Sequence, residues 1–334
     1  MKNTIICCIF CLLLSSCSKT LFTESTQNPL SLYDEFWTHV NDNYIFFQEK
    51  EVDWEDVYQK YSKNLSEHSS EEELLQAMEN SLLELKDAHN VIRTPFRASK
   101  KYNYTEGYAV HFSPELVEEK YIKGNFAEER SFRYGAIDEE SIYIYVPKME
   151  SIHQLRNLIR NLVVEQSKNL IIDVRNNGGG NSNPVPELLG DFVDKETLLG
   201  SYIEKSGPKR EDETVPLPVY AFPSPDYHFD IKVALLINRA GYSATSYLAG
   251  MCKGLDNFTL FGQVTGGGAG GNAGYELSNG WELAISVSDF IDKQGNTIEL
   301  GVQPDIEVIN QESDISNGVD VMLEAAIDHL RSGG

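Results

Sequence analysis

The chain has 334 residues, a formal net charge of −23 at pH 7 and 41% hydrophobic residues. Nucleic-acid binding is disfavoured, because the sequence contains no basic stripe that could neutralise phosphates. A chain of this length can bury a large core without disulfides. Four of its five cysteines lie within the first 17 residues, and we expect the fifth, Cys252, to be buried in a helix.

The first 16 residues are typical of a secretory signal peptide, with Lys2 ahead of an apolar run that ends at Leu14. The run is too short for a helix to cross about 30 Å of hydrocarbon. The tetrapeptide LSSC at residues 14–17 resembles a bacterial lipobox, which implies lipidation of Cys17. An ordinary cleaved signal is the alternative. We therefore expect an exported, membrane-anchored lipoprotein of the cell envelope, and Ser18 favours the outer membrane.

Residues 17–28 are predicted to form a polar, lipidated tether, and residues 29–89 a small helical domain. Aromatic and aliphatic side chains recur there three or four residues apart, as in amphipathic helices. A serine at 69 or 70 followed by acidic residues indicates a capped helix start. One apolar face of that helix is formed by Leu74, Leu75, Met78, Leu82 and Leu85.

Residues 90–334 are predicted to form an α/β domain. Its first part, 90–148, contains short extended segments separated by glycine, proline and charged clusters. Strands then alternate with helices, which indicates layers around a largely parallel sheet. A hairpin is expected at Asn279-Gly280, and the last helix follows residue 316.

Ser243 stands where a buried strand ends and the next helix begins. A helix N-terminus offers free backbone N–H groups and a positive dipole end, and both stabilise a developing oxyanion. The position therefore suits a nucleophile. A serine there can also be a simple helix cap.

A second strand runs into the glycines of NNGGG at residues 176–180. Glycines after a strand allow a substrate to approach the main chain closely, so the amide of Gly178 or Gly179 could be an oxyanion donor. A flexible turn is the alternative. A phosphate-binding loop is disfavoured because no Gly-Lys-Ser/Thr ends the run.

Four segments occur in a characteristic order: DVRNNGG at 173–179, NR followed by Ser243-Ala244, GQVTGG at 262–267 and GVQPD at 301–305. This series resembles the C-terminal-processing and tricorn-core serine peptidases, whose catalytic domain has a crotonase/ClpP-like α/β fold. The resemblance implies that Ser243 is the nucleophile. It also implies that the amides of Gly179 and Ala244 form the oxyanion hole.

The base that activates the serine distinguishes two branches of this family. The processing-protease branch has a lysine within Thr-x-Gly-Lys-Gly, but this chain reads TGGG at 265–268. The tricorn-like branch takes a histidine from the end of the helical region, and LKDAH at 85–89 matches it. The resemblance therefore implies that His89 is the base and Glu299 its supporting acid. Without the resemblance, His89 would be read as a surface histidine after a helix.

Relatives often have a serine directly before this histidine, whereas this chain has Ala88. Glu299 is therefore expected to act through a water or another hydroxyl, for which Ser246 is a candidate. The segment 90–148 is too short for both linking strands and a PDZ module, so we predict no PDZ domain between residues 95 and 140.

The expected function is a serine peptidase that cleaves a peptide or protein substrate through an acyl-enzyme. The alternative is an inactive family member that binds a peptide or a small apolar ligand. An α/β-hydrolase esterase is disfavoured by the order His, Ser, Glu and by the absence of Gly-x-Ser-x-Gly. The remaining histidines show no metal-ligand spacing, and neither a metal nor a cofactor is expected.

Overall fold

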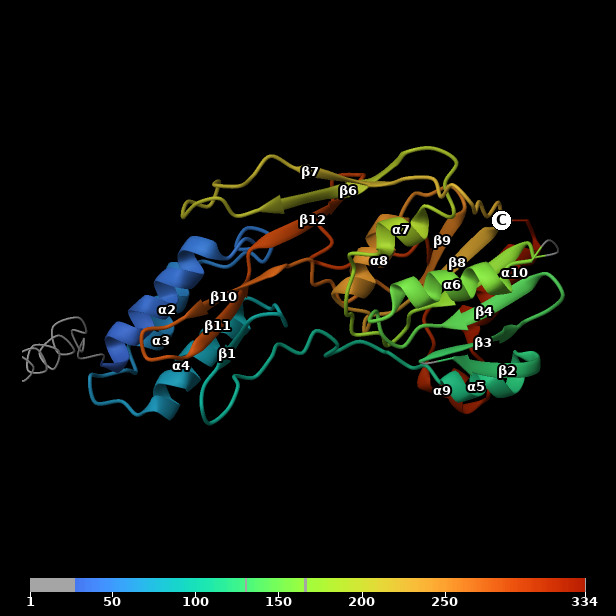
Figure 1. Cartoon of the computed structure of the whole chain (residues 1–334). Coiled ribbons are helices and arrows are strands. Elements are labelled where there is room, and N and C mark those ends of the chain that lie inside the picture. Colours follow the sequence, from blue (N-terminus) through green and yellow to red (C-terminus); the bar gives the residue numbers. More distant parts are fainter. Residues whose placement is uncertain (1–27, 130, 165–166, 334) are drawn as a thin grey trace, which may run out of the picture.

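A computed structural model of the chain describes residues 28–129, 131–164 and 167–333. The predicted signal peptide and the lipidation at Cys17 lie outside the described residues. Among the residues it covers, no helix combines the length and apolar character needed to cross a membrane. The molecule is elongated, with the N-terminal helices at one end and a large sheet at the other (Figure 1).

In the part of the chain that the structure describes, the end that we call the N-terminal lobe contains three helices, α2 (Pro29–Asn43), α3 (Trp54–Ser62) and α4 (Glu71–Glu84). α4 begins at the predicted capping box, because Ser70 and Glu73 each accept a hydrogen bond from the other's backbone. The apolar face predicted for this helix is buried.

The N-terminal lobe also includes strands from distant parts of the chain. A three-stranded antiparallel sheet has the order β1 (Val91–Arg93), β11 (Glu282–Ser286) and β10 (Asn272–Glu276). β10 and β11 form the hairpin predicted at Asn279-Gly280, and it packs beside α2 and α4 (Figure 1). The lobe therefore extends beyond the boundary expected at residue 89.

The other end, which we call the sheet lobe, is built on a seven-stranded sheet. Its strands, in spatial order, are β13 (Ile306–Glu307), β9 (Phe258–Gly262), β8 (Lys232–Ile237), β5 (Asn169–Asp173), β4 (Ser141–Tyr145), β3 (Phe132–Ala136) and β2 (Lys123–Glu129). The strands from β4 to β13 are parallel, while β2, β3 and β4 pair antiparallel. The predicted α/β class is confirmed.

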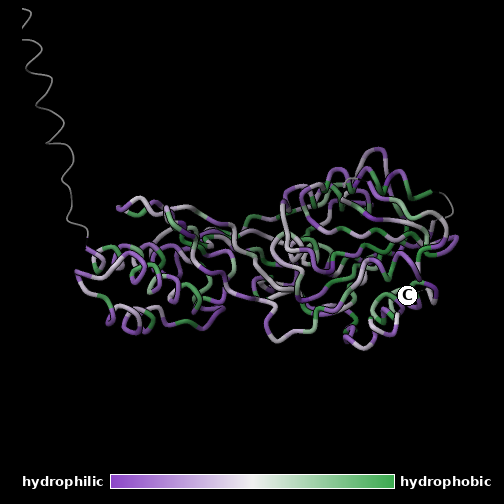
Figure 2. Tube along the Cα trace, turned by 90° about the horizontal axis from the view of Figure 1, so that it is seen from below, coloured by the Kyte–Doolittle hydropathy of each residue, from purple (hydrophilic) through white to green (hydrophobic). Residues whose placement is uncertain are grey.

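Helices cover both faces of this sheet (Figure 1). One face carries α6 (Ile152–Leu162), α7 (Val185–Leu189) and α8 (Ala244–Cys252), and the other carries α5 (Pro114–Lys120), α9 (Glu312–Ser316) and α10 (Val321–Arg331). The central strands are apolar throughout because both faces are buried. In β5, Leu170 and Ile172 join the core beneath α6 to α8, while Ile171 joins the core beneath α10. Figure 2 shows these hydrophobic stretches inside the sheet-containing end.

A third sheet, with the order β12 (Ser288–Asp292), β6 (Thr197–Glu204) and β7 (Leu217–Ala221), lies above the junction of the two lobes (Figure 1). The described part of residues 95–140 contains α5, β2 and β3, and both strands extend the main sheet. That arrangement agrees with the expectation of no PDZ module there. Cys252 is a free, buried helical cysteine, as predicted.

Candidate active site

Ser243 lies at the carboxyl end of the central parallel strands, between β8 and α8. Its backbone has φ 55° and ψ −122°, a conformation that is sparsely populated for a non-glycine residue. Its N–H donates to Gly267 O at 2.9 Å. The side chain makes no capping hydrogen bond to α8, so its hydroxyl is not used as a helix cap.

His89 belongs to the turn after α4 and lies across the lobe junction from Ser243. His89 Nε2 is 3.0 Å from Ser243 Oγ, although the residues are 154 positions apart. Burial lowers the pKa of His89 from 6.5, and the negative charge of Asp87 acts in the opposite direction. The imidazole is therefore neutral at neutral pH and can accept the hydroxyl proton.

Gly179 and Ala244 both adjoin the serine. A Cβ on Gly179 would be 2.8 Å from Ser243 Cβ and 2.7 Å from Tyr242 O, and φ is +107°, so only glycine fits. The N–H of Gly179 donates to Asn177 Oδ1 at 3.0 Å. Ala244 begins α8, where backbone N–H groups have no acceptor within the helix.

Glu299 is buried and faces Lys50 instead of His89. Lys50 Nζ is 2.6 Å from Glu299 Oε1, and Ala269 N donates to Glu299 Oε2 at 2.8 Å. Burial, together with the charge of Asp87, raises the pKa of Glu299 to about 8, and Lys50 opposes this shift.

The expected relay from Glu299 through Ser246 is not formed. Ser246 Oγ donates to Gly267 O at 2.8 Å and also lies 2.8 Å from Thr265 Oγ1. Both contacts hold the glycine loop against α8. Ser246 therefore has a structural position beneath the site and makes no contact with either Glu299 or His89 among the described hydrogen bonds.

Asp87 is a residue of the site that the sequence reasoning missed. Its side chain is buried, and Oδ1 lies 3.9 Å from His89 Nδ1. Oδ1 accepts hydrogen bonds from His89 N at 2.8 Å and from Tyr242 OH at 3.2 Å, and Oδ2 accepts one from Ser286 Oγ at 2.7 Å. The only sequence signal was its place two residues before the histidine in the LKDAH motif.

Tyr242 occupies the space beside Gly268, the position that matches the lysine of Thr-x-Gly-Lys-Gly. A Cβ on Gly268 would lie 2.5 Å from the Tyr242 ring. The ring stacks on Tyr104 with centroids 4.2 Å apart, and its centroid is 4.9 Å from that of His89. The chain therefore has no room for a side chain at the position of the missing lysine.

A cavity of about 270 Å³ adjoins this site, lined by Tyr104, Arg239, Tyr242 and Glu299 among others. Arg239 closes one side, because its Nε donates to Tyr104 O at 2.8 Å and its Nη1 to Thr265 O at 2.9 Å. The loop that contains Tyr104 is thereby fixed over the glycine loop.

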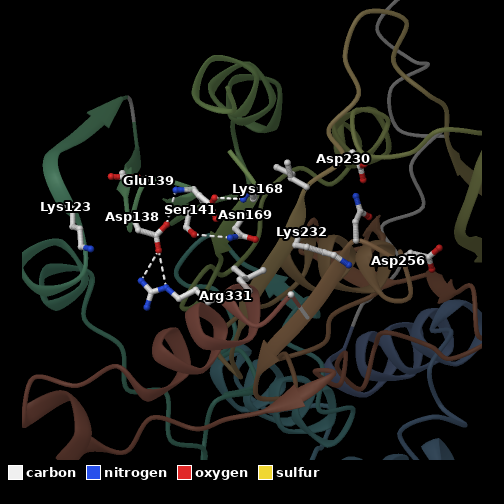
Figure 3. Close-up of a pocket in the computed structure, with 16 residues that line it drawn as sticks. Lys123, Asp138, Glu139, Ser141, Lys168, Asn169, Asp230, Lys232, Asp256 and Arg331 are labelled. Atoms are coloured by element: carbon white, nitrogen blue, oxygen red, sulfur yellow. Dashed lines mark hydrogen bonds and ion pairs between the residues drawn. The ribbon is translucent and has the colours of Figure 1, made fainter. Parts of the chain in front are cut away.

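A larger cavity, of about 1230 Å³, lies at the amino ends of the central strands (Figure 3). It adjoins the beginnings of β4, β5 and β8, far along each strand from the serine. Its polar side chains largely pair with one another, as Arg331 does with Asp138 at 2.9 Å and Asn169 with Ser141 at 3.2 Å. In the part of the chain that the structure describes, no group of three or more His, Cys, Asp or Glu could hold a metal ion.

Comparison with known families agrees with this geometry. The model of peptidase family S41 matches residues 141–308, and that of the tricorn protease C1 domain matches residues 25–82. The chain belongs to peptidase family S41. The first match runs from β4 to β13 and includes Ser243, and the second includes α2, α3 and most of α4.

Individual proteins resemble the chain to different extents. The crystal structure of a putative peptidase from Parabacteroides merdae is 30% identical, with a TM-score of 0.84 over 92% of this chain and 98% of that one. A carboxyl-terminal-processing protease of Synechocystis is 26% identical over 61% of this chain and 45% of that protein. The carboxy-terminal processing protease CtpB of Bacillus subtilis is 24% identical over 45% and 30%. The chain thus spans less than half the length of these two curated relatives.

Proposed function

We propose that this S41 chain is a serine peptidase that hydrolyses peptide bonds of a peptide or protein substrate through an acyl-enzyme. The observation that carries this proposal is the 3.0 Å contact between His89 Nε2 and Ser243 Oγ. A neutral imidazole in contact with a serine hydroxyl at a helix N-terminus is the arrangement that acyl transfer requires.

In the proposed mechanism, His89 Nε2 takes the proton of Ser243 Oγ while Oγ attacks the substrate carbonyl carbon. The amides of Ala244 and Gly179 stabilise the negative oxygen of the tetrahedral intermediate. For Gly179 this requires that its N–H leave Asn177 Oδ1 when substrate binds. His89 then gives the proton to the leaving amine, the C–N bond breaks, and a water deprotonated by His89 hydrolyses the ester.

Glu299 supports the nucleophile indirectly in this proposal. Its backbone O accepts a hydrogen bond from Gly268 N at 3.3 Å, and its carboxylate accepts one from Ala269 N. The same glycine loop supplies the carbonyl of Gly267 that holds Ser243 N. Glu299 therefore holds the glycine loop in place, and that loop in turn holds the strained backbone of Ser243.

The alternative of an inactive binding protein is less well supported. A degenerate enzyme would be expected to hold the histidine and the serine apart, whereas here they are in hydrogen-bond contact. We place the activity in the cell envelope, on a lipid anchor at Cys17 in the outer membrane. This setting rests on the signal-like first 16 residues and the LSSC motif.

The test is labelling of the purified chain with a fluorescent fluorophosphonate, beside Ser243→Ala and His89→Ala variants of confirmed fold. We expect labelling of the wild type, none of Ser243→Ala and strongly slowed labelling of His89→Ala. A folded wild-type protein that does not label would support the binding-protein alternative.

A further inference from the structure

The imidazole of a serine peptidase needs a hydrogen-bond acceptor at the nitrogen that does not face the serine. That acceptor fixes the tautomer with Nδ1–H and stabilises the imidazolium formed during attack. In this chain Ala88 offers no polar side chain. His89 Nδ1 is buried without a hydrogen-bond partner among the described residues. The carboxylate oxygen Asp87 Oδ1 lies 3.9 Å from it.

Two buried carboxyl groups, those of Glu299 and Asp87, lie near the site. They differ in the groups that contact them. Glu299 Oε1 lies 2.6 Å from the ammonium of Lys50, and with a pKa of about 8 the group is largely protonated at neutral pH, so it carries little charge that could act on His89. Asp87 accepts hydrogen bonds from neutral donors, the backbone of His89 and the hydroxyls of Tyr242 and Ser286. Among the described ion pairs, its only cationic partner would be a protonated His89. The charge of Asp87 is therefore the one free to respond when the imidazole gains a proton.

The donors to Asp87 come from three separate parts of the fold. His89 N belongs to the turn after α4, Tyr242 directly precedes the nucleophile, and Ser286 ends β11. A carboxylate held from three sides keeps its orientation while its neighbour changes charge. The charge of Asp87 acts on the described titratable side chains His89, Tyr44, Tyr242 and Glu299. The ammonium groups of Lys50 and Lys101 also act on His89, and they lower its pKa.

The distance of 3.9 Å is longer than a hydrogen bond, which requires about 2.7–3.2 Å between heavy atoms. Catalytic hydrogen bonds are often long without substrate and tighten in the complex. A shift of about 1 Å would complete this one, by the same geometric criterion. The hydrogen bond from His89 N to Asp87 Oδ1 keeps the two residues close together during that shift.

We propose that Asp87 is the carboxylate that orients His89 and stabilises its protonated form, with Tyr242 and Ser286 holding Asp87 in place. Asp87 thereby has the role of supporting acid for His89, which the family resemblance assigned to Glu299. This inference rests on the proposed peptidase function. Asp87 acts through His89 and is a positioning residue, since it touches neither the nucleophile nor the substrate.

The test measures the second-order rate of labelling by the fluorescent fluorophosphonate as a function of pH, on the full purified chain. Asp87→Asn removes the charge and keeps the shape. We expect labelling to slow by about 10³- to 10⁴-fold, since replacement of a triad carboxylate by an amide costs about 10⁴ in rate. The acid limb should also move to lower pH, because the charge of Asp87 raises the pKa of His89. A merely structural role would not move that limb.

Three further variants separate this role from others. Asp87→Glu should recover part of the rate, because it restores a carboxylate. Glu299→Gln should slow labelling less than Asp87→Asn and leave the acid limb in place. Glu84→Gln, at the exposed end of α4, should label like the wild type. If Asp87→Asn does not fold, Tyr242→Phe replaces it. That variant keeps the ring and loses one donor to Asp87, so we expect labelling about tenfold slower.

These experiments distinguish failure of the Asp87 proposal from failure of the proposed peptidase function. A wild-type chain that does not label overturns both proposals. A wild type that labels, with folded Asp87→Asn labelling at a similar rate and the same pH midpoint, overturns only the role of Asp87. If Asp87→Asn does not fold and Tyr242→Phe is used instead, an unchanged labelling rate in Tyr242→Phe also overturns the role of Asp87.

Discussion

Lys50 Nζ lies 2.6 Å from Glu299 Oε1, and this buried ion pair joins the two lobes. Lys50 follows α2 in the N-terminal lobe, the lobe that supplies His89. Glu299 contacts the glycine loop that holds Ser243. The contact between the proposed base and nucleophile therefore depends on the same interface as the ion pair.

Replacement of Lys50 by Met should destabilise the protein by about 3 kcal/mol above pH 8, because it leaves a carboxylate buried without its partner. The measurement is the free energy of unfolding in urea. Lys60→Met is the matched control, since Lys60 pairs with Glu84 on the exposed side of the same lobe. The control should lose much less, because both of its charges are solvated. Equal losses in the two variants would contradict the prediction.

Glu299 should also make stability depend on pH. Its pKa in the folded protein is about 8, raised from 4.5 by burial and by Asp87. A carboxyl group with a raised pKa contributes stability that is fully present below about pH 4.5 and is lost as pH rises through about 8. The expected change is on the order of a few kcal/mol.

The measurement for Glu299 compares the unfolding free energies of the wild type and Glu299→Gln from about pH 5 to about pH 9. The difference between the two proteins isolates this group from other carboxylates, such as Asp289, whose pKa burial raises to about 7. The wild type should lose stability relative to the variant as pH rises. A difference that stays constant across this range would show that Glu299 does not titrate there.

A third prediction concerns the pH dependence of activity, which is determined by the proposed base, His89. Only the neutral imidazole of His89 can accept the serine proton, so activity should be present above its pKa and fall below it. Burial lowers that pKa from 6.5, which places the midpoint of the acid limb below 6.5. The rate of fluorophosphonate labelling as a function of pH measures it. A midpoint above 6.5 would mean that the attraction of Asp87 outweighs burial.

Local patterns in the sequence were sufficient for much of the fold. The start of α4 follows from Ser70 and Glu73, and the hairpin from Asn279-Gly280, because each signal acts over a few residues. The α/β class follows from alternating apolar strands and amphipathic helices. The pairing of His89 with Ser243 came from the family resemblance, since neither residue is distinctive alone.

Contacts between distant segments were beyond these patterns. The β10–β11 hairpin joins the N-terminal lobe through pairing with β1, about 190 positions away in the chain. Asp87 acquires its position from donors at Tyr242 and Ser286, which lie 155 and 199 positions away. Contacts between such distant positions leave no periodic pattern in the sequence. The proximity of Asp87 to His89 Nδ1 could therefore be found only from the structure.

Gly268 provides a final test, because it separates backbone strain from crowding at the site. Gly268 and Gly280 have the same φ of +82°, but a Cβ at Gly280 would meet nothing within 4 Å. At Gly268 a Cβ would lie 2.5–2.8 Å from atoms of the Tyr242 ring. Both alanine variants carry the left-handed backbone penalty of about 1–2 kcal/mol. Gly268→Ala should lose a further 1–3 kcal/mol, roughly, through overpacking.

The same comparison should extend to activity. Displacement of the Tyr242 ring would disturb the neighbouring His89, whose ring centroid is 4.9 Å away, so Gly268→Ala should label more slowly with the fluorophosphonate. Gly280→Ala, at a hairpin tip, should keep the wild-type rate. Gly268→Lys should not create a Ser–Lys pair, because its first side-chain carbon already collides with Tyr242. Wild-type labelling by Gly268→Ala would show that the ring can move without consequence for the base.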